Sequence, residues 1–360
     1  MVSRNISILF YEAREDGMAS HDEVVEQVSQ ALTAGGHRVS LLGVRDDIRE
    51  LMDKLREQQP DIVFNLCETF AGKDAYEMHI TALLEMLGVR FTGTGPSGMV
   101  MRQDKALSKR LLKFYDVNCS SYAVFDKKRL EFAGRMRFPL FIKPLHGDAS
   151  LGVDDSSLVD DYSKLIARAE FIQSELNDAA LVEEYIDGRE LYVSILGNDP
   201  PEALPIIEVD FSKLPAGHPR IYGHEAKFEA DTVQYDGTHT EVGQNLLPEV
   251  RSRVARAAKE AVHALQINDY ARVDIRLPPE GIPYVVEVNA NPYLEATSET
   301  ALAANAAGID YNTLINRILD IAWERWERGM PVKKARRPAR VAIRQRDKIA
   351  PTCLKVQPLA

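Results

Sequence analysis

The sequence lacks most features that would place a protein in a membrane, in an oxidising compartment or among the P-loop enzymes. No apolar run reaches the roughly 18 residues of a membrane-spanning helix. The N-terminus, MVSRNISILFYEARED, has a short apolar segment followed by acids, unlike a secretory signal. The three cysteines, Cys67, Cys119 and Cys353, have no metal-binding spacing, which favours a reducing cytoplasm. No G-x-x-x-x-G-K-[ST] motif occurs, which excludes the P-loop NTPases.

The charge of the chain is unevenly distributed. The net charge is −10, from 44 Lys and Arg against 54 Asp and Glu. Residues 331–360 hold nine basic residues and one acid, so residues 1–330 hold 35 basic and 53 acidic residues. Such an acidic body should repel nucleic-acid backbones, and we expect neither a nucleic-acid nor a membrane partner. The basic tail is interpreted as an extended, solvated segment.

Strand-like and helix-like segments alternate along the first 95 residues. Compact apolar runs typical of buried strands occur at residues 6–10, 39–42 and 61–66. Segments with helical spacing occur between and after them, at residues 24–32, 48–58 and 76–87. This order predicts a parallel sheet with helices on both of its faces.

Two further blocks follow, each with its own strands and helices. The second is expected to have strands at 122–125, 140–143, 181–185 and 191–196, a charged helix-like stretch between the first two, and a helix at 161–176. The third is expected to have strands at 204–209, 271–277 and 284–288 and helices at 248–265 and 311–328. Residues 212–246 show little periodicity and are expected to form a long functional loop.

Residues 93–98 (GTGPSG) match the G-x-G-x-x-G pattern of dinucleotide-binding folds, which keeps a dehydrogenase as one alternative. The pattern comes after two earlier strand–helix units, however. No strand ending in Asp or Glu follows about 20 residues later. We interpret the motif as a tight turn before a helix at 103–114.

Two strand-like runs carry polar side chains at alternating positions. Arg272 and Asp274 lie on the first run, and Glu287 and Asn289 lie on the second. Residues two apart on a strand point to the same face, and the short link at 281–283 makes the two runs a plausible hairpin. Two carboxylates and an amide would then share one face. These are hard oxygen ligands, so the pattern indicates a Mg²⁺ site.

Two other segments indicate a nucleotide. Lys143 ends a strand and is followed by the loop HGDASLG, so a positive charge and backbone N–H groups could hold phosphates together. The segment LVEEYIDGRE at 181–190 is a buried strand followed by carboxylates. Such a strand could present its backbone to an adenine and a Glu to a ribose. The simpler interpretation is a hairpin with a solvated turn.

Taken together, these segments resemble the ATP-grasp superfamily and, within it, the D-alanine–D-alanine ligase family. The matching pieces follow the family's order over about residues 60–320: FTGTGPSG, DKALSKRLL, FIKPLHGDASLG, LVEEYIDGRELYVSILGN, HEAKFEADTVQY, ARVDIRL and VVEVNANPYLEATSE. The resemblance implies an α/β protein of ATP-grasp fold, with the nucleotide between a central α+β lid and a C-terminal domain. The implied domains are 1–101, 102–198 and 199–330, before the tail at 331–360.

The resemblance also implies roles for individual residues. The implied nucleotide-binding set is Lys105, Lys143, Ser150, Glu183, Tyr185, Ile186, Glu190 and Lys227. Within it, the lysines face phosphates and Glu190 binds the ribose. The adenine hinge is formed by Glu183, Tyr185 and Ile186. The implied metal ligands are Asp274, Glu287 and Asn289. The implied catalytic residues are Arg272, Lys227 and Ser150, with Arg272 stabilising a tetrahedral intermediate.

The activity that this resemblance implies is ATP- and Mg²⁺-dependent ligation, with Mn²⁺ as an alternative ion. A small-molecule carboxylate would become an acyl phosphate and an amine would then displace the phosphate. The alternatives are an authentic D-alanine–D-alanine ligase of cell-wall synthesis and an ATP-binding protein without ligase activity. The family further implies a cytoplasmic homodimer formed through the N-terminal domain.

The substrate half of the pattern departs from the family. Cys67-Glu68 stands where the family has His-Gly, and Pro292-Tyr293 stands where it has a small Pro-Gly element. We therefore expect an altered substrate and assign Glu68, Tyr293 and Ser298 to its binding, although Ser298 could also cap a helix. The added acids Glu68, Glu295 and Glu299 would suit a substrate that bears an amine or a guanidinium group.

Overall fold

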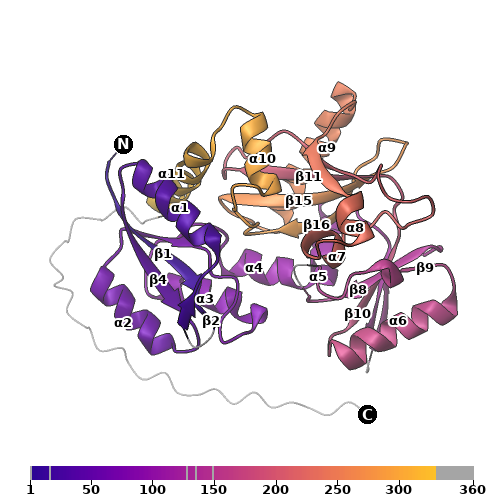
Figure 1. Cartoon of the computed structure of the whole chain (residues 1–360), viewed down its shortest axis with the longest axis horizontal. Coiled ribbons are helices and arrows are strands. Elements are labelled where there is room, and N and C mark those ends of the chain that lie inside the picture. Colours follow the sequence, from indigo (N-terminus) through magenta and orange to yellow (C-terminus); the bar gives the residue numbers. More distant parts are fainter. Residues whose placement is uncertain (1, 16–17, 127–128, 134–135, 148–149, 330–360) are drawn as a thin grey trace, which may run out of the picture.

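The computed structural model describes residues 2–15, 18–126, 129–133, 136–147 and 150–329. They form three larger sheets and a two-stranded ribbon, with helices packed against the sheets (Figure 1). The basic tail predicted at 331–360 lies outside the described residues. No helix in the described ranges is long and apolar enough to cross a membrane.

The first sheet is parallel, as the alternation of strands and helices predicts, with the order β4–β1–β5. Its central strand is buried on both faces because its residues alternate between two apolar clusters. Ile6 and Ile8 pack with α1 and the C-terminal helix α11, whereas Leu9 packs with α2 and α3. The elements are β1 (Asn5–Tyr11), β2 (Ala13–Glu15), β3 (Met18–Ser20), α1 (Glu23–Ala34), β4 (Arg38–Val44), α2 (Ile48–Gln58), β5 (Ile62–Asn65), η1 (Asp74–Tyr76) and α3 (Glu77–Met86).

The helix expected at 103–114 is present as α5 (Lys105–Phe114), and a separate helix that the sequence analysis did not predict, α4 (Pro96–Gln103), precedes it. Asp104 has an extended backbone, and its carboxylate accepts hydrogen bonds of 2.9 Å from the N–H groups of Ala106 and Leu107. Asp104 therefore caps a new helix instead of continuing the first one. The GTGPSG segment opens α4 at its N-cap, Gly95.

The central sheet is antiparallel, with the order β7–β6–β10–β8–β9. The prediction of a helix for the charged stretch is wrong, because this stretch contains the edge strand β7. Its sequence, RLEFA, alternates charged and apolar residues with the period of a strand. The elements are β6 (Tyr122–Asp126), β7 (Arg129–Ala133), β8 (Leu140–Pro144), η2 (Asp155–Ser157), β9 (Leu158–Val159), α6 (Tyr162–Glu175) and β10 (Ala180–Glu184).

The third sheet has the order β14–β13–β11–β15–β16, with β12 paired to β11. β11 was expected in the central block but pairs along its whole length with β15. The expected loop at 212–246 contains two short helices and a strand. The elements are β11 (Arg189–Leu196), β12 (Glu202–Ala203), β13 (Ile207–Asp210), α7 (His224–Phe228), α8 (Val233–Gly237), β14 (His239–Val242), α9 (Pro248–Ala264), β15 (Tyr270–Leu277), β16 (Tyr284–Asn289), α10 (Glu299–Ala306) and α11 (Tyr311–Gly329).

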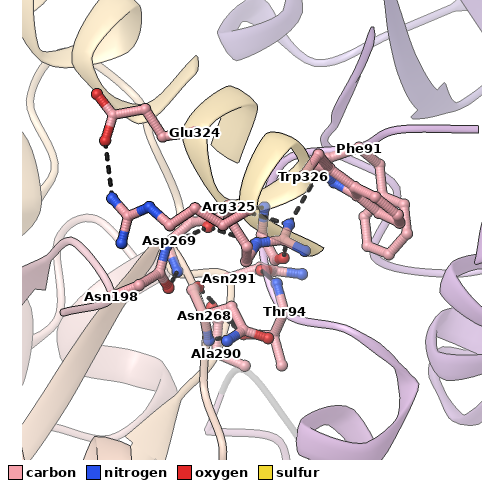
Figure 2. Close-up of polar contacts among 12 residues, drawn as sticks. Phe91, Thr94, Asn198, Asn268, Asp269, Ala290, Asn291, Glu324, Arg325 and Trp326 are labelled. Carbon is pink, nitrogen blue, oxygen red and sulfur yellow. Dashed lines mark hydrogen bonds and ion pairs between the residues drawn. The ribbon is translucent and has the colours of Figure 1, made fainter. Parts of the chain in front are cut away.

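A buried carboxylate joins the first sheet, the third sheet and the last helix (Figure 2). Asp269, just before β15, is fully buried and accepts hydrogen bonds from the N–H of Gly93 (2.8 Å) and from Asn198 Nδ2 (2.9 Å). Arg325 of α11 donates from Nε and Nη2 to the same carboxylate, at 2.8 Å each. Arg325 also donates to the carbonyl oxygen of Phe91 (2.9 Å).

The contacts of Asp269 explain the glycine-rich motif without a bound dinucleotide. The N–H of Gly93 is taken by the protein's own carboxylate at Asp269, so the dinucleotide alternative finds no support here. Gly93 has φ of +89°, and an added Cβ would lie 2.5 Å from Asn291 Oδ1. A left-handed backbone and a close neighbour both require glycine at this position.

Replacing Arg325 by Ala should lower the free energy of unfolding by about 3 kcal/mol, because it leaves a buried carboxylate without its main countercharge. Arg328→Ala, which removes an exposed pair with Glu324 on the same helix, should change it by less than about 0.5 kcal/mol. Urea unfolding of the wild type and both variants measures the difference. Equal destabilisation by the two substitutions would contradict this role of Arg325.

Candidate active site

Every residue that the sequence assigns to a site lines one cavity of about 1250 Å³. The walls come mainly from β8 and β10 of the central sheet and from β15 and β16 of the third sheet. The structure thus brings the whole predicted set together: Glu68, Lys105, Lys143, Ser150, Glu183, Tyr185, Ile186, Glu190, Lys227, Arg272, Asp274, Glu287, Asn289, Tyr293 and Ser298.

The hairpin expected from the short link at 281–283 is present. β15 and β16 pair in antiparallel fashion, with Arg272 opposite Asn289 and Asp274 opposite Glu287. Directly opposed residues of an antiparallel pair place their side chains on the same face. Two carboxylates, an amide and a guanidinium therefore meet on one side of this hairpin.

Asp274 is held by its neighbours on this face. Arg272 donates from Nε to Oδ1 (2.8 Å) and from Nη2 to Oδ2 (3.2 Å), and Asn289 Nδ2 donates to Oδ2 (3.2 Å). Burial raises the pKa of the Asp274 carboxyl, and the adjacent guanidinium opposes that shift. The guanidinium also donates from Nη1 to Glu299 Oε2 (3.1 Å), so two carboxylates flank it.

The donor set of the hairpin is compatible with Mg²⁺. Asp274, Glu287 and Asn289 offer hard oxygen atoms on one face, which is the chemistry that Mg²⁺ prefers. Within the described ranges, no group of three or more His, Cys, Asp or Glu is arranged to hold a metal. An ion at this hairpin would therefore complete its coordination with water and phosphate oxygens.

Two lysines face the acidic hairpin from the opposite wall. Lys143 Nζ lies 3.7 Å from Glu287 Oε2, and Lys105 Nζ lies 3.4 Å from Glu287 Oε1. Burial alone would lower the pKa of Lys143, but the carboxylates of Glu183 and Glu287 outweigh it and raise the pKa. Lys143 therefore stays positively charged, as a ligand of phosphate oxygens must be.

The side chain of Glu183 lies in a buried ionic cluster. Its carboxylate is 3.2 Å from Lys143 Nζ and 2.5 Å from Lys109 Nζ, and it accepts a hydrogen bond from Ser120 Oγ (2.7 Å). Burial alone would raise the pKa of Glu183, but the two lysines and the hydroxyl lower it to about 2. The family resemblance assigns Glu183 to the adenine hinge. That assignment stays a prediction, and the carboxylate in addition positions Lys143. Lys109 is a residue that the sequence analysis missed.

Arg276 is a second residue that the sequence analysis missed. It is buried, pairs with Glu190 at 2.8 Å and lies 3.5 Å from the hydroxyl of Tyr185. It therefore links the two residues assigned to adenine and ribose. The sequence did carry a signal for Arg276, because Arg272, Asp274 and Arg276 follow one another at strand spacing. In the structure all three line the cavity.

Ser150 and Lys227 connect the two walls. Lys227 Nζ, on α7, donates to Ser150 Oγ (3.0 Å) in the loop that follows β8. The same ammonium lies 5.1 Å from the ring centroid of Tyr222, a cation–π distance. This bond ties the central sheet to the third sheet's connecting segment at the cavity.

The residues assigned to the substrate have protein partners of their own. Tyr293 donates its hydroxyl to Asp22 Oδ1 (2.6 Å), a residue that the sequence analysis missed. Ser298 is the N-cap of α10 and accepts from the N–H of Ala301 (3.4 Å), which matches its alternative interpretation. Glu68 is exposed and lines the cavity.

Comparison with known proteins identifies the family. The family model described as D-ala D-ala ligase C-terminus matches residues 111–320. The chain belongs to the D-alanine–D-alanine ligase family. It is 34% identical to the uncharacterised protein y4sG of Sinorhizobium fredii, over 84% of this chain and 88% of that protein. It is 27% identical to the D-alanine–D-alanine ligase of Pelotomaculum thermopropionicum, over 86% and 95%.

The predicted ATP-grasp fold is confirmed by a solved structure. The D-alanine–D-alanine ligase of Bacillus anthracis, crystallised with ATP, matches with a TM-score of 0.68 and 23% identity, over 91% of this chain and 99% of that one. As a member of this ligase family, the chain is an ATP-dependent, ADP-forming carbon–nitrogen ligase.

The pKa of Glu183 makes a testable prediction about stability and pH. Its folded value of about 2 lies below the ordinary 4.5, so ionised Glu183 stabilises the fold above pH 4.5, and this contribution is lost as the pH falls towards 2. In Glu183→Gln the free energy of unfolding should depend less steeply on pH in this window, by up to about 1.4 kcal/mol per pH unit. Urea unfolding at stepped pH measures both slopes, with Glu184→Gln as a control for removing one charge from β10. Parallel profiles for wild type and Glu183→Gln would show that the carboxylate is not held as described.

Proposed function

We propose that the chain joins the carboxylate of one small molecule to the amine of another, while ATP is converted to ADP and phosphate through an acyl phosphate. One observation carries the proposal. Lys105 and Lys143 face the carboxylates of Asp274 and Glu287 across a single cavity, with Arg272 beside them. Cations for phosphates and oxygen ligands for a metal thus lie in one place, as phosphoryl transfer requires.

The nucleotide would lie between the central and third sheets. Lys105 and Lys143 would bind its phosphates, and Lys227 with Ser150 would close over them. Tyr185 and Ile186 would border the adenine, with Glu190 on the ribose. Buried ammonium groups that are already paired with the carboxylate of Glu287 support this assignment. Phosphate oxygens could replace Glu287 as their partners, and a bound metal ion would then be the countercharge of Glu287.

Asp274, Glu287 and Asn289 would hold Mg²⁺, or Mn²⁺ in its place. When bound, the ion would supply neutralisation of charge on the phosphate oxygens. The residues themselves contribute a rigid donor face, because cross-strand pairing fixes Asp274 against Glu287 and the hydrogen bond from Asn289 Nδ2 orients the Asp274 carboxylate.

The reaction would proceed in two displacements. An oxygen of the substrate carboxylate bonds to the γ-phosphorus while the bridging P–O bond breaks and ADP leaves. The amine nitrogen then bonds to the acyl carbon and loses a proton, and phosphate leaves as the C–O bond breaks. Arg272, oriented by Asp274 and Glu299, is the donor that would stabilise negative charge on the acyl oxygen. The Ser150–Lys227 bond would keep water from the acyl phosphate.

The substrates are proposed to be amino acids, or an amino acid and a small acid. Named relatives are D-alanine–D-alanine ligases, so D-alanine is the first substrate to test. The substrate end of this chain carries Cys67-Glu68 and Tyr293 in place of the family's residues, and we infer a different pair. A cytoplasmic location and a homodimer remain predictions.

Asp274→Asn should lower kcat for phosphate release at least about 100-fold, because it removes a metal ligand and a partner of Arg272. Phosphate and ADP are measured with MgATP and pairs of amino acids of both hands. Glu280→Gln, an exposed change in the turn of the same hairpin, is the matched control and should retain full activity. Chelation of Mg²⁺ should abolish release in the wild type.

Three other outcomes are informative. Full activity in Asp274→Asn would overturn the assigned metal site. Release with D-alanine alone would identify an authentic D-alanine–D-alanine ligase. Saturable ATP binding without phosphate release for any pair would indicate a nucleotide-binding protein that does not perform the ligation.

A further inference from the structure

A second cavity, which we call the side cavity, adjoins the one described above and has no role in the proposed reaction. Its volume is about 370 Å³, and the two cavities share seven lining residues: Asp22, Glu68, Thr69, Glu77, Asn291, Pro292 and Tyr293. The shared residues include Glu68 and Tyr293, which were assigned to the substrate, and none of the lysines. A water molecule, which is close in size to a methyl group, takes up about 30 Å³ in the liquid. The side cavity therefore has room for a group much larger than the methyl of alanine.

The side cavity lies where the first sheet offers a binding crevice. Phe10 and Tyr11 at the end of β1 and Asn65 at the end of β5 line it. β1 and β5 are adjacent parallel strands. From β1 the chain continues to β4, which lies on the far side of β1 from β5, and from β5 it continues to α3. A crevice at the carboxyl ends of strands where the connections diverge is the usual binding position of an open α/β sheet.

One residue that lines the side cavity, Asn65, carries a buried donor without a partner. The side-chain oxygen of Asn65 accepts a hydrogen bond from the N–H of Cys67 (3.2 Å), which fixes the orientation of the amide. Its Nδ2 then has no hydrogen-bond partner among the described residues, although Asn65 is only 1% exposed. The hydroxyl of Thr69, where the two cavities meet, likewise has none. Leaving a buried donor unsatisfied is unfavourable, so we expect a ligand in the side cavity to satisfy it.

The remaining walls limit the charge of that ligand. Much of the wall is apolar, from side chains such as Phe10, Val25 and Leu294, and the thiol of Cys67 adds to it. The polar groups that line only the side cavity, besides Asn65, are the rings of Tyr11, His21 and Tyr270, none of which is an anion at neutral pH. Burial raises the pKa of Cys67 to about 12, so the thiol is neutral and unreactive at physiological pH.

The carboxylates lie where the two cavities meet, at Asp22, Glu68 and Glu77. An anionic side chain would have to pass these carboxylates. A cationic one would be desolvated against apolar walls and would leave the Asn65 donor unsatisfied. An uncharged side chain that carries a hydrogen-bond acceptor avoids both of these penalties.

We propose that the side cavity receives the side chain of one amino-acid substrate, and that this side chain is uncharged, larger than a methyl group and ends in a hydrogen-bond acceptor. A carboxamide is the best match, because its oxygen can accept from Asn65 Nδ2 while its NH₂ can donate to Thr69 Oγ1. The inference rests on the proposed function and specifies its substrate class.

Phosphate release with the full chain, MgATP and pairs of amino acids of both hands tests the inference. In the wild type, kcat/KM for asparagine or glutamine should exceed kcat/KM for alanine at least tenfold. Asn65→Asp keeps the acceptor for the Cys67 N–H but removes the donor, and Ala13→Leu narrows the side cavity from β2. Each should lower the ratio at least tenfold. The control Ala34→Leu, an equal enlargement at the exposed end of α1, should keep the wild-type ratio. A wild-type preference for alanine, lysine or glutamate, or a ratio unchanged in both variants, would overturn the inference.

A binding measurement separates this inference from the proposed function. If no pair releases phosphate, the proposed function fails, but ligand binding can still be read from the melting temperature in the presence of ADP and Mg²⁺. Asparagine or glutamine should raise the melting temperature of the wild type more than alanine does. Ala13→Leu should remove that difference, and Ala34→Leu should keep it. Equal shifts for all amino acids would mean that the side cavity holds only water, whatever the activity.

Discussion

A carboxylate that is fully removed from water is tolerated only when donors surround it, and Asp269 imposes this constraint on the whole fold. Its partners come from segments that are far apart in the sequence: Gly93 in the turn before α4, Asn198 after β11, and Arg325 in the last helix. Asp269 immediately precedes β15, the strand that carries Arg272 and Asp274. The N-terminal sheet and the last helix therefore fix where the hairpin of β15 and β16 begins.

The other strand of the hairpin is fixed to the same turn. Asn291, two residues beyond Asn289, accepts a hydrogen bond from the N–H of Thr94 (3.2 Å) (Figure 2). Its Nδ2 also donates to Glu77 Oε1 (3.3 Å). Both strands are thus tied to the GTGPSG segment, one through the carboxylate of Asp269, which accepts from the Gly93 N–H, and one through the amide of Asn291. A site that needs two carboxylates and two lysines in register gains from such rigid anchoring, because small displacements weaken phosphoryl transfer.

The features that the sequence predicted well are those with local patterns. Strand–helix alternation predicted the first sheet, and alternating polar residues predicted the hairpin. The errors arose where a pattern was short or a partner was distant. RLEFA is too short to separate a strand from a helix, and the pairing of β11 with β15 depends on contacts 74 to 88 residues away. Lys109 and Asp22 have no motif of their own, since their roles follow from packing against Glu183 and Tyr293.

The substrate end shows why charge counting alone misleads. The added acids predict a cationic substrate, but the fold pairs one of them, Glu299, and two other acids at this end, Asp22 and Glu77, with its own groups. Glu299 accepts from Arg272, Asp22 accepts from Tyr293 and from the first turn of α1, and Glu77 pairs with Arg102. A carboxylate that already has a protein partner attracts a ligand cation less strongly than an isolated one. Discrimination between substrates therefore depends on the shape of the site and on its donors without partners. A buried site can reject an analogue that leaves such donors unsatisfied.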